Sequence, residues 1–195
     1  MEIGRYMAAT DQELARMSMD GDPQAFAQLF NRYRDSIYQL YMGRLDGNAD
    51  DTNDLLQETF IKVFLNLHKY KEEYTFGQWV YTIARNTFID HIRKKRDDIS
   101  LDDLPPGMHG LTPAAPAPTP EESFINSQQR TLLESYLERM SERYRTLIRL
   151  RFFKGYSYEE IAAELSLRMG TVKTQIHRAR EQLCRMIVEE NDILP

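Results

Sequence analysis

An acidic, proline-rich stretch near the middle of the chain most strongly limits what it can fold into. Residues 97–122 read DDISLDDLPPGMHGLTPAAPAPTPEE and hold six of the eight prolines, six acids and no Lys or Arg. Proline fixes φ and removes a backbone donor, and Ala-Pro repeats favour extended polyproline II backbone. Because so few of its residues are large and apolar, we do not expect this stretch to fold alone. We predict a flexible linker between two domains, residues 1–96 and 123–195.

The first domain has the apolar periodicity and capping signals of helices. Asp22-Pro23 predicts an N-cap followed by proline in the first turn of a long helix. A second helix is expected from near Asp51. Thr75 and Gln78 have capping-box spacing ahead of a third, FGQWVYTIARNTFIDHIRKK. No stretch of the chain alternates with period two over strand length, so the predicted fold is all-α, with two small helical domains.

The second domain is patterned as a helix-turn-helix. After helices expected near 121–139 and 142–153 comes SYEEIAAELSLRMGTVKTQIHRAREQL, which opens with a second capping box, Ser157 and Glu160. This segment divides into a short helix, a turn of about four residues and a second helix. The apolar stripe of that second helix is Val172, Ile176, Ala179 and Leu183. In known complexes the second helix of such a unit enters the major groove of DNA.

The same second helix carries a basic face without acids. Residues 168–180, RMGTVKTQIHRAR, contain no Asp or Glu, although the chain as a whole has 25 Lys+Arg and 30 Asp+Glu. Lys and Arg gain affinity for DNA by releasing its counterions, and an acid in such a face would repel phosphates. A basic run alone is as compatible with a solvated helix face, but the helix-turn-helix pattern favours DNA binding. The face opposite the stripe displays Thr174, His177 and Arg178, flanked by Thr171 and Lys173, with Arg168 and Arg180 within reach of phosphates.

Catalysis and metal binding are not expected. The histidines show no paired ligand spacing, and no glycine-rich phosphate loop is present. Asp51, Asp54 and Glu58 share one helix face, but a Ca²⁺ or Mg²⁺ site needs more oxygen ligands and usually a shaped loop. Three carboxylates in that arrangement also suit a docking surface for a basic partner or plain solvation. We therefore predict a protein that is not an enzyme and has no catalytic residue, no metal and no cofactor.

The location of the protein is also predicted from the sequence. The amino terminus lacks the basic and apolar regions of a signal peptide, and no apolar run is long enough to span a bilayer. The single cysteine, Cys184, cannot form an internal disulfide, which fits a reducing compartment. We expect a cytoplasmic protein without membrane insertion.

Several of these segments resemble the extracytoplasmic-function (ECF) sigma factors of bacterial RNA polymerase. GDPQAFAQLFNRY, DDTNDLLQETFIKVF and FGQWVYTIARNTFIDHIRKKR resemble region 2 of that family. YRTLIRLRFFKGYSYEEIAAELSLRMGTVKTQIHRAREQL resembles region 4, and the order of the motifs is that of the family. The resemblance covers nearly the whole chain except the linker. One departure is Ser166, where the family often has glycine in the turn, and a non-glycine residue with positive φ is uncommon but tolerated.

The resemblance implies a promoter-recognition subunit of RNA polymerase, responsive to a stress or signal. Its implied partners are core RNA polymerase (the β′ clamp helices and the β flap), promoter DNA and an anti-sigma factor, and we expect a monomer. Region 4 would read the −35 element as duplex through Arg168, Thr171, Lys173, Thr174, His177 and Arg178. Region 2 would dock on the clamp helices through Asp51, Asp54, Leu55, Gln57 and Glu58.

Region 2 would also bind the −10 element and help to open it. The ring-rich loop of residues 69–79 fits this role, since aromatic side chains stack on unpaired bases. Phe76, Trp79, Val80 and Ile83 have helical spacing and are expected mostly in the core, so the two tyrosines of the loop are the better candidates. The predicted −10 residues are Tyr70, Tyr74, Asn86, Asp90, Arg93, Lys94, Lys95 and Arg96.

A stand-alone helix-turn-helix regulator is the alternative function. Such a protein would be expected to carry an amino-terminal βαβ receiver or a ligand domain, whereas residues 1–96 have a helical pattern. It would also hold duplex DNA alone, whereas a sigma factor needs core polymerase for tight, specific binding.

Overall fold

The computed structural model describes the backbone of residues 2–95 and 120–188 and the side chains of residues 4–93 and 130–188. Over these ranges the chain forms helices and turns without a strand, which confirms the all-α prediction. Most of the predicted linker, residues 97–119, lies outside the described residues.

The elements before the linker include two helices at the amino terminus that the sequence analysis did not predict. The order is α1 (Glu2–Ala8), α2 (Asp11–Met19), α3 (Pro23–Met42), α4 (Ala49–Asn66), the short 3₁₀ helix η1 (Leu67–Lys69) and α5 (Phe76–Lys95). The capping box that begins α2 was the signal for it, because Thr10 and Glu13 satisfy each other's backbone N–H groups. Helix α4 begins two residues before the predicted Asp51, because the side chain of Asn48 caps it.

The predicted caps of α3 and α5 are confirmed. Oδ1 of Asp22 accepts hydrogen bonds from the backbone N–H of Gln24 at 3.0 Å and of Ala25 at 3.3 Å. At α5, the backbone N–H of Thr75 donates to Oε1 of Gln78 and that of Gln78 donates to Oγ1 of Thr75. These bonds satisfy helix N–H groups that have no partner within the helix, so both helices begin where expected.

Helices α3, α4 and α5 pack around a common aromatic core. Phe26 and Phe64 meet edge to face, with ring centroids 5.0 Å apart. Tyr41 is fully buried, and its hydroxyl lies 2.6 Å from Oγ1 of Thr59 on α4 and donates to the carbonyl of Ala84 on α5 at 2.8 Å. One side chain of α3 thus connects the other two helices.

The elements after the linker contain the predicted helix-turn-helix. They are α6 (Pro120–Arg139), α7 (Glu142–Ile148), the π-helical segment η3 (Arg149–Phe153), α8 (Tyr158–Glu164) and α9 (Met169–Val188). The single helix predicted for 142–153 was wrong in detail, because the last five residues widen into π-helical geometry. The capping box of α8 and the stripe of α9 are confirmed, and Ser166 in the turn has φ 51°.

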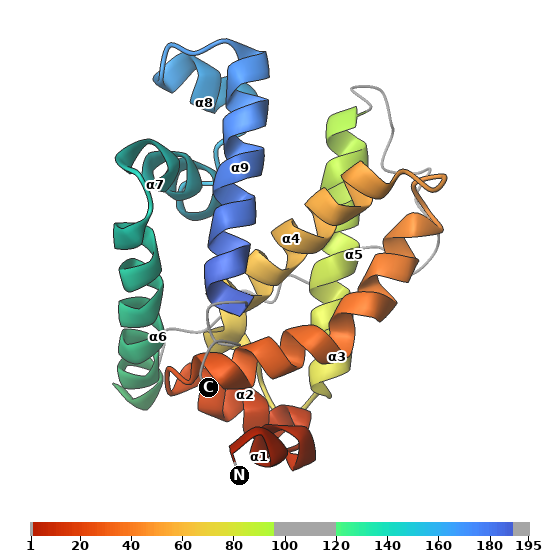
Figure 1. Ribbon diagram of the computed structural model, residues 1–195, viewed down its shortest axis with the longest axis vertical. Coiled ribbons are helices and arrows are strands. Elements are labelled where there is room, and N and C mark those ends of the chain that lie inside the picture. Colours follow the sequence, from red (N-terminus) through yellow and green to blue (C-terminus); the bar gives the residue numbers. More distant parts are fainter. Residues whose placement is uncertain (1, 96–119, 189–195) are drawn as a thin grey trace.

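The two halves of the chain pack against each other through α9. Figure 1 shows α9 between α7 on one side and α4 on the other, and it also packs against α3. A small core inside the helix-turn-helix holds Ile161, Val172 and Ile176. Farther along α9, Leu183 and Ile187 belong to the same hydrophobic core as α3 and α4. The described residues therefore form a closed arrangement, in which helices from both sides of the linker share buried apolar surface.

Candidate functional site

The predicted reading face of region 4 lies on α9 and on the turn before it. Arg168, Lys173, Thr174, His177 and Arg178 are exposed, and Thr171 is half-buried. The opposite stripe of α9 is buried, which holds these side chains on one side of the helix. The first acid of α9 is Glu181, beyond the predicted face. The exposed side of α9 thus presents basic and hydroxyl groups, a chemistry suited to phosphates and base edges.

Arg180 was expected to reach DNA phosphates, and this expectation was wrong for the closed arrangement. The side chain points towards α4 and is only 3% exposed. Its Nη2 lies 2.7 Å from Oδ2 of Asp54, and its Nη1 lies 3.6 Å from Oε2 of Glu58. The position of Arg180 at the edge of the stripe turns it towards the neighbouring helix rather than towards solvent.

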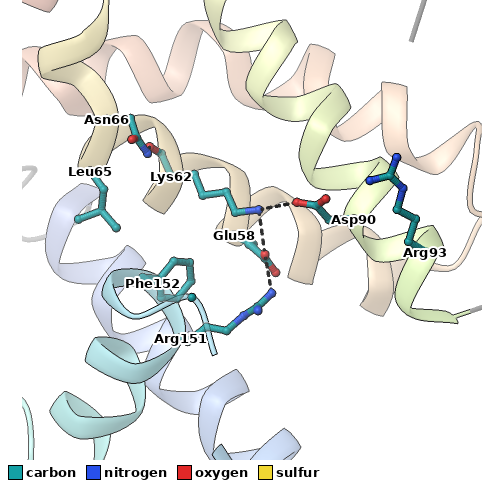
Figure 2. Close-up of a pocket in the computed structure, with 9 residues that line it drawn as sticks. Glu58, Lys62, Leu65, Asn66, Asp90, Arg93, Arg151 and Phe152 are labelled. Atoms are coloured by element: carbon teal, nitrogen blue, oxygen red, sulfur yellow. Dashed lines mark hydrogen bonds and ion pairs between the residues drawn. The ribbon is translucent and has the colours of Figure 1, made fainter. Parts of the chain in front are cut away.

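Glu58 is the centre of a group of charges that joins the two halves of the chain. Its Oε1 lies 3.0 Å from Nη2 of Arg151 in η3 and 3.2 Å from Nζ of Lys62, one turn along α4 (Figure 2). Burial alone would raise the pKa of Glu58, but the positive charges of Lys62, Arg151 and Arg180 outweigh burial and lower this pKa to about 2. Glu58 therefore stays ionised although it is buried.

His177 of the reading face also contacts this group of charged residues. Its Nδ1 lies 2.8 Å from Oδ1 of Asp54, the same carboxylate that binds Arg180. We call the six residues the ion-pair cluster: Asp54, Glu58, Lys62, Arg151, His177 and Arg180. Lys62 and Arg151 were not among the residues predicted from the sequence. The i, i+4 spacing of Glu58 and Lys62 was a usable signal, whereas nothing local pointed to Arg151.

The predicted polymerase-docking residues lie along α4, and all of them except Gln57 line a cavity together with Arg151 of η3 and Arg180 of α9. Leu55 and Glu58 are buried, and Asp51, Asp54 and Gln57 are half-buried. Asp51 also accepts a hydrogen bond from Nδ2 of Asn48 at 3.1 Å. The carboxylates that were predicted to meet a partner protein are thus engaged within the chain.

The two predicted loop tyrosines have different environments. Tyr74 is 60% exposed, whereas Tyr70 is 7% exposed and packs against Phe76 and Trp79, with ring centroids 5.3 and 5.5 Å away. The hydroxyl of Tyr70 donates to the carbonyl of Tyr74 at 2.9 Å. In this arrangement Tyr70 supports the loop, and Tyr74 is the ring available for stacking.

The remaining predicted −10 residues follow α5. Asn86, Asp90 and Arg93 are exposed, and Oδ2 of Asp90 lies 3.6 Å from Nζ of Lys62. Lys94 and Lys95 end the helix, with side chains outside the described residues, and Arg96 lies outside them altogether. Arg93 and Lys62 also border an open cavity of about 630 Å³ between α4, α5 and η3 (Figure 2).

The described part of the chain shows neither a metal site nor a membrane-spanning helix. Within it, no group of His, Cys, Asp and Glu is arranged to hold a metal ion. No described helix combines the length and apolar character that crossing a membrane requires. Cys184 is buried in the core, as expected for a small apolar residue.

Comparison with known proteins identifies the two halves separately. Residues 29–97 match the family model of sigma-70 region 2, and residues 130–183 match that of sigma-70 region 4. The chain thus contains both sigma-70 regions, one on each side of the predicted linker.

Relatives match over nearly the full length. The chain is 36% identical over 171 residues to the ECF RNA polymerase sigma factor SigW of Bacillus subtilis, covering 86% of this chain and 91% of that protein. It is 32% identical over 191 residues to the ECF RNA polymerase sigma-E factor of Haemophilus influenzae, covering 95% and 96%. A solved structure of CnrH in complex with the cytosolic domain of CnrY is 26% identical, with coverage of 89% and 94% and a TM-score of 0.38. The chain belongs to the ECF family of RNA polymerase sigma factors, which are transcription initiation factors and not enzymes.

Proposed function

We propose that this protein binds core RNA polymerase and directs it to promoters by reading a −35 element with α9 and a −10 element with region 2. The observation that supports the proposal most directly is the reading face of α9. Its exposed Lys173, Thr174 and Arg178 lie on the second helix of a helix-turn-helix, in a stretch of that helix that contains no acid. Docking such a helix in the major groove would bring these side chains to base edges and phosphates.

Region 2 supplies the second contact of the proposed mechanism. The exposed ring of Tyr74 would stack on a base of the opened −10 strand, and the basic end of α5 would meet phosphates. The acidic face of α4 would dock on the β′ clamp helices. Two weak contacts joined by the linker reinforce each other, because binding of one raises the effective concentration of the other.

The proposed partners follow from the family. They are core polymerase, promoter DNA and an anti-sigma factor that holds the protein inactive until a signal arrives. The free chain is proposed to bind DNA weakly, unlike a stand-alone regulator. Electrophoretic mobility shifts with and without core polymerase separate these alternatives.

The test of promoter reading is the double variant Lys173→Ala/Arg178→Ala. Both side chains are exposed, so the fold should be kept. Run-off transcription with core polymerase from a genomic promoter pool should first identify a cognate promoter, and the variant should then lose at least about tenfold in transcription from it, since each good base contact contributes about 1–3 kcal/mol. Binding to core polymerase should persist.

The matched control is Arg143→Ala, which removes an exposed positive charge from α7, outside the reading face. It should transcribe like the parent protein. Equal loss in the control and the double variant would contradict the assignment of α9, and so would equal loss of core binding by the double variant.

A further inference from the structure

The turn that carries Tyr74 has no buried side chain of its own. Residues 71–75 are all exposed. The backbone N–H of Tyr74 donates to the carbonyl of Lys71 at 3.2 Å and closes a four-residue turn. Glu72 and Glu73 are the two central residues of this turn. A segment without buried apolar contacts is free to move unless polar contacts hold it, so the position of this turn depends on its charged side chains.

Arg16 of α2 holds the turn through Glu72. Nε of Arg16 lies 2.5 Å from Oε1 of Glu72, and Nη2 of Arg16 lies 2.5 Å from Oε2. Two such bonds between one guanidinium and one carboxylate fix the orientation of the two groups as well as their distance. The hydrogen bonds from Arg16 also hold the pKa of the Glu72 carboxyl below its ordinary value, so the carboxylate stays ionised at neutral pH.

The backbone of Arg16 is fixed, because α2 is anchored in the core. Leu14 and Ala15, the two residues directly before it, are fully buried. At the start of α2, Oδ1 of Asp11 lies 2.7 Å from Nη1 of Arg32 on α3. The guanidinium of Arg16 therefore reaches from a firmly packed helix to a turn that has no apolar anchor.

This contact involves a helix that lies outside the matched part of region 2. The family model covers residues 29–97, whereas α2 ends at Met19. Arg16 and Glu72 are 56 positions apart in the sequence, so the packing of α2 beside the loop brings them together. The Arg16–Glu72 ion pair thus gives the amino-terminal part of the chain a contact with the proposed −10 surface.

The ion pair also affects the charge around Tyr74. Between residues 69 and 75 two lysines balance two glutamates, so this segment by itself is neutral at pH 7. Arg16 adds one positive charge beside the turn and engages the carboxylate of Glu72. The phosphates of a DNA strand at this surface would therefore meet a net positive charge.

We propose that Arg16 is a positioning residue for capture of the −10 strand, which fixes the turn of residues 71–74 through Glu72 and so places the ring of Tyr74 for stacking on an unpaired base. The ion pair itself rests on this structure, and its effect on promoter opening rests on the proposed function. A ring held in its binding position loses less freedom when the strand arrives, so preorganisation of the turn favours the open complex.

Glu72→Gln and Glu73→Gln separate positioning from charge. Both variants remove one negative charge from the centre of the same turn, and it is Glu72 that is paired with Arg16. If repulsion of DNA were all that mattered, both variants would open a promoter better than the parent. Positioning predicts that open complex falls about two- to fivefold for Glu72→Gln, the scale of one exposed ion pair, and does not fall for Glu73→Gln. Permanganate reactivity of thymines in the −10 element, with core polymerase present, measures the opening.

Two further variants test whether Arg16 acts through the ion pair and through the ring. The exchange Arg16→Glu/Glu72→Arg rebuilds the pair with reversed charges, so opening should return towards the parent value, whereas Arg16→Ala should lose as much as Glu72→Gln. In a Tyr74→Ala background Arg16→Ala should cause no further loss, because a positioning residue contributes only through the group that it places. Full additivity of the two losses would contradict positioning. Circular dichroism should show the parent's helix content in every variant, since the exchanged side chains are exposed.

Backbone ¹⁵N relaxation of the free chain tests the ion pair without polymerase or DNA. The order parameters of residues 71–74 should fall in Arg16→Ala and in Glu72→Gln and stay unchanged in Glu73→Gln. Unchanged order parameters in Arg16→Ala would overturn the proposal, and so would equal promoter opening by the two glutamine variants. Normal opening by Tyr74→Ala would instead reject the strand-capture role of the loop, and relaxation would still decide whether Arg16 holds the turn.

Discussion

The guanidinium of Arg180 lies 2.7 Å from the carboxylate of Asp54, although the two residues belong to opposite halves of the chain. Arg180 is almost completely buried by this contact. Buried ion pairs add little net stability, because desolvation offsets most of the attraction, but they are costly to break one partner at a time. The pair therefore specifies how the halves fit together more than it stabilises the fold.

Glu58→Gln should change how stability depends on pH. The folded pKa of Glu58 is lowered from 4.5 to about 2, so its contribution is fully present above about pH 4.5 and is lost as the pH falls through 2. At pH 7 the free energy of unfolding should be about 3 kcal/mol lower for the variant than for the parent. At pH 3 this difference should narrow to about 1 kcal/mol. Urea denaturation followed by circular dichroism measures both values. The exposed Glu138→Gln is the control, and a gap for Glu58→Gln that does not vary with pH would contradict the assigned ion pairs.

Tyr41→Phe should destabilise region 2 without changing its shape. The substitution removes the hydroxyl that joins Thr59 on α4 to Ala84 on α5 and leaves buried polar atoms with fewer partners. The expected loss is about 1–3 kcal/mol in the free energy of unfolding. Tyr74→Phe, in an exposed ring of the same region, should be neutral. Equal stability of Tyr41→Phe and the parent in thermal denaturation would show that this hydroxyl makes no net contribution.

Ser166→Gly should stabilise the helix-turn-helix. Ser166 has φ 51°, a left-handed conformation that is unfavourable for residues with a Cβ and open to glycine. Relief of this strain should exceed the entropy that glycine adds to the unfolded chain, giving a gain of up to about 1 kcal/mol. Ser166→Val should instead lower the free energy of unfolding, since a β-branched residue tolerates positive φ poorly. Calorimetry on both variants checks the order, and a valine variant as stable as the glycine variant would refute it.

Tyr74→Ala should impair promoter opening and leave core binding intact. Loss of one stacked ring should cost about 1–3 kcal/mol, or about five- to 150-fold in the amount of open complex. Permanganate reactivity of thymines in the −10 element measures this opening directly. Tyr70→Ala is the informative comparison, because Tyr70 is buried against Phe76 and Trp79 and its loss should lower the melting temperature of the protein. Normal opening by Tyr74→Ala would exclude this ring from strand capture.

Local features of this protein were predictable because each depends on spacing within a turn or two of one helix. Asp22 and Ser157 cap helices for reasons contained in the next three residues, and both caps are present. The stripe from Val172 to Leu183 is buried because an α-helix repeats every 3.6 residues. The positive φ at Ser166 fits the family resemblance, because the family often has glycine at this position of the turn.

The environment of the charged residues was not predictable in this way. The basic stretch of α9 suggested that Arg180 faces DNA like its neighbours, whereas the packing of α9 on α4 buries it. Tyr70 and Tyr74 could not be told apart from the sequence, because both are tyrosines of the same ring-rich loop. Packing against Phe76 and Trp79 buries Tyr70, whereas Tyr74 is exposed.

Local periodicity and composition were thus enough to predict most of the helices, the caps of α3, α5 and α8, and the basic face of α9, but not α1, α2 or the π-helical segment η3. Tertiary structure decided that Arg151 and Arg180 meet Asp54 and Glu58, and therefore which charges are free. The physical reason is that pairing of buried charges depends on how closely two helices from distant parts of the chain approach. No pattern within either helix encodes that approach.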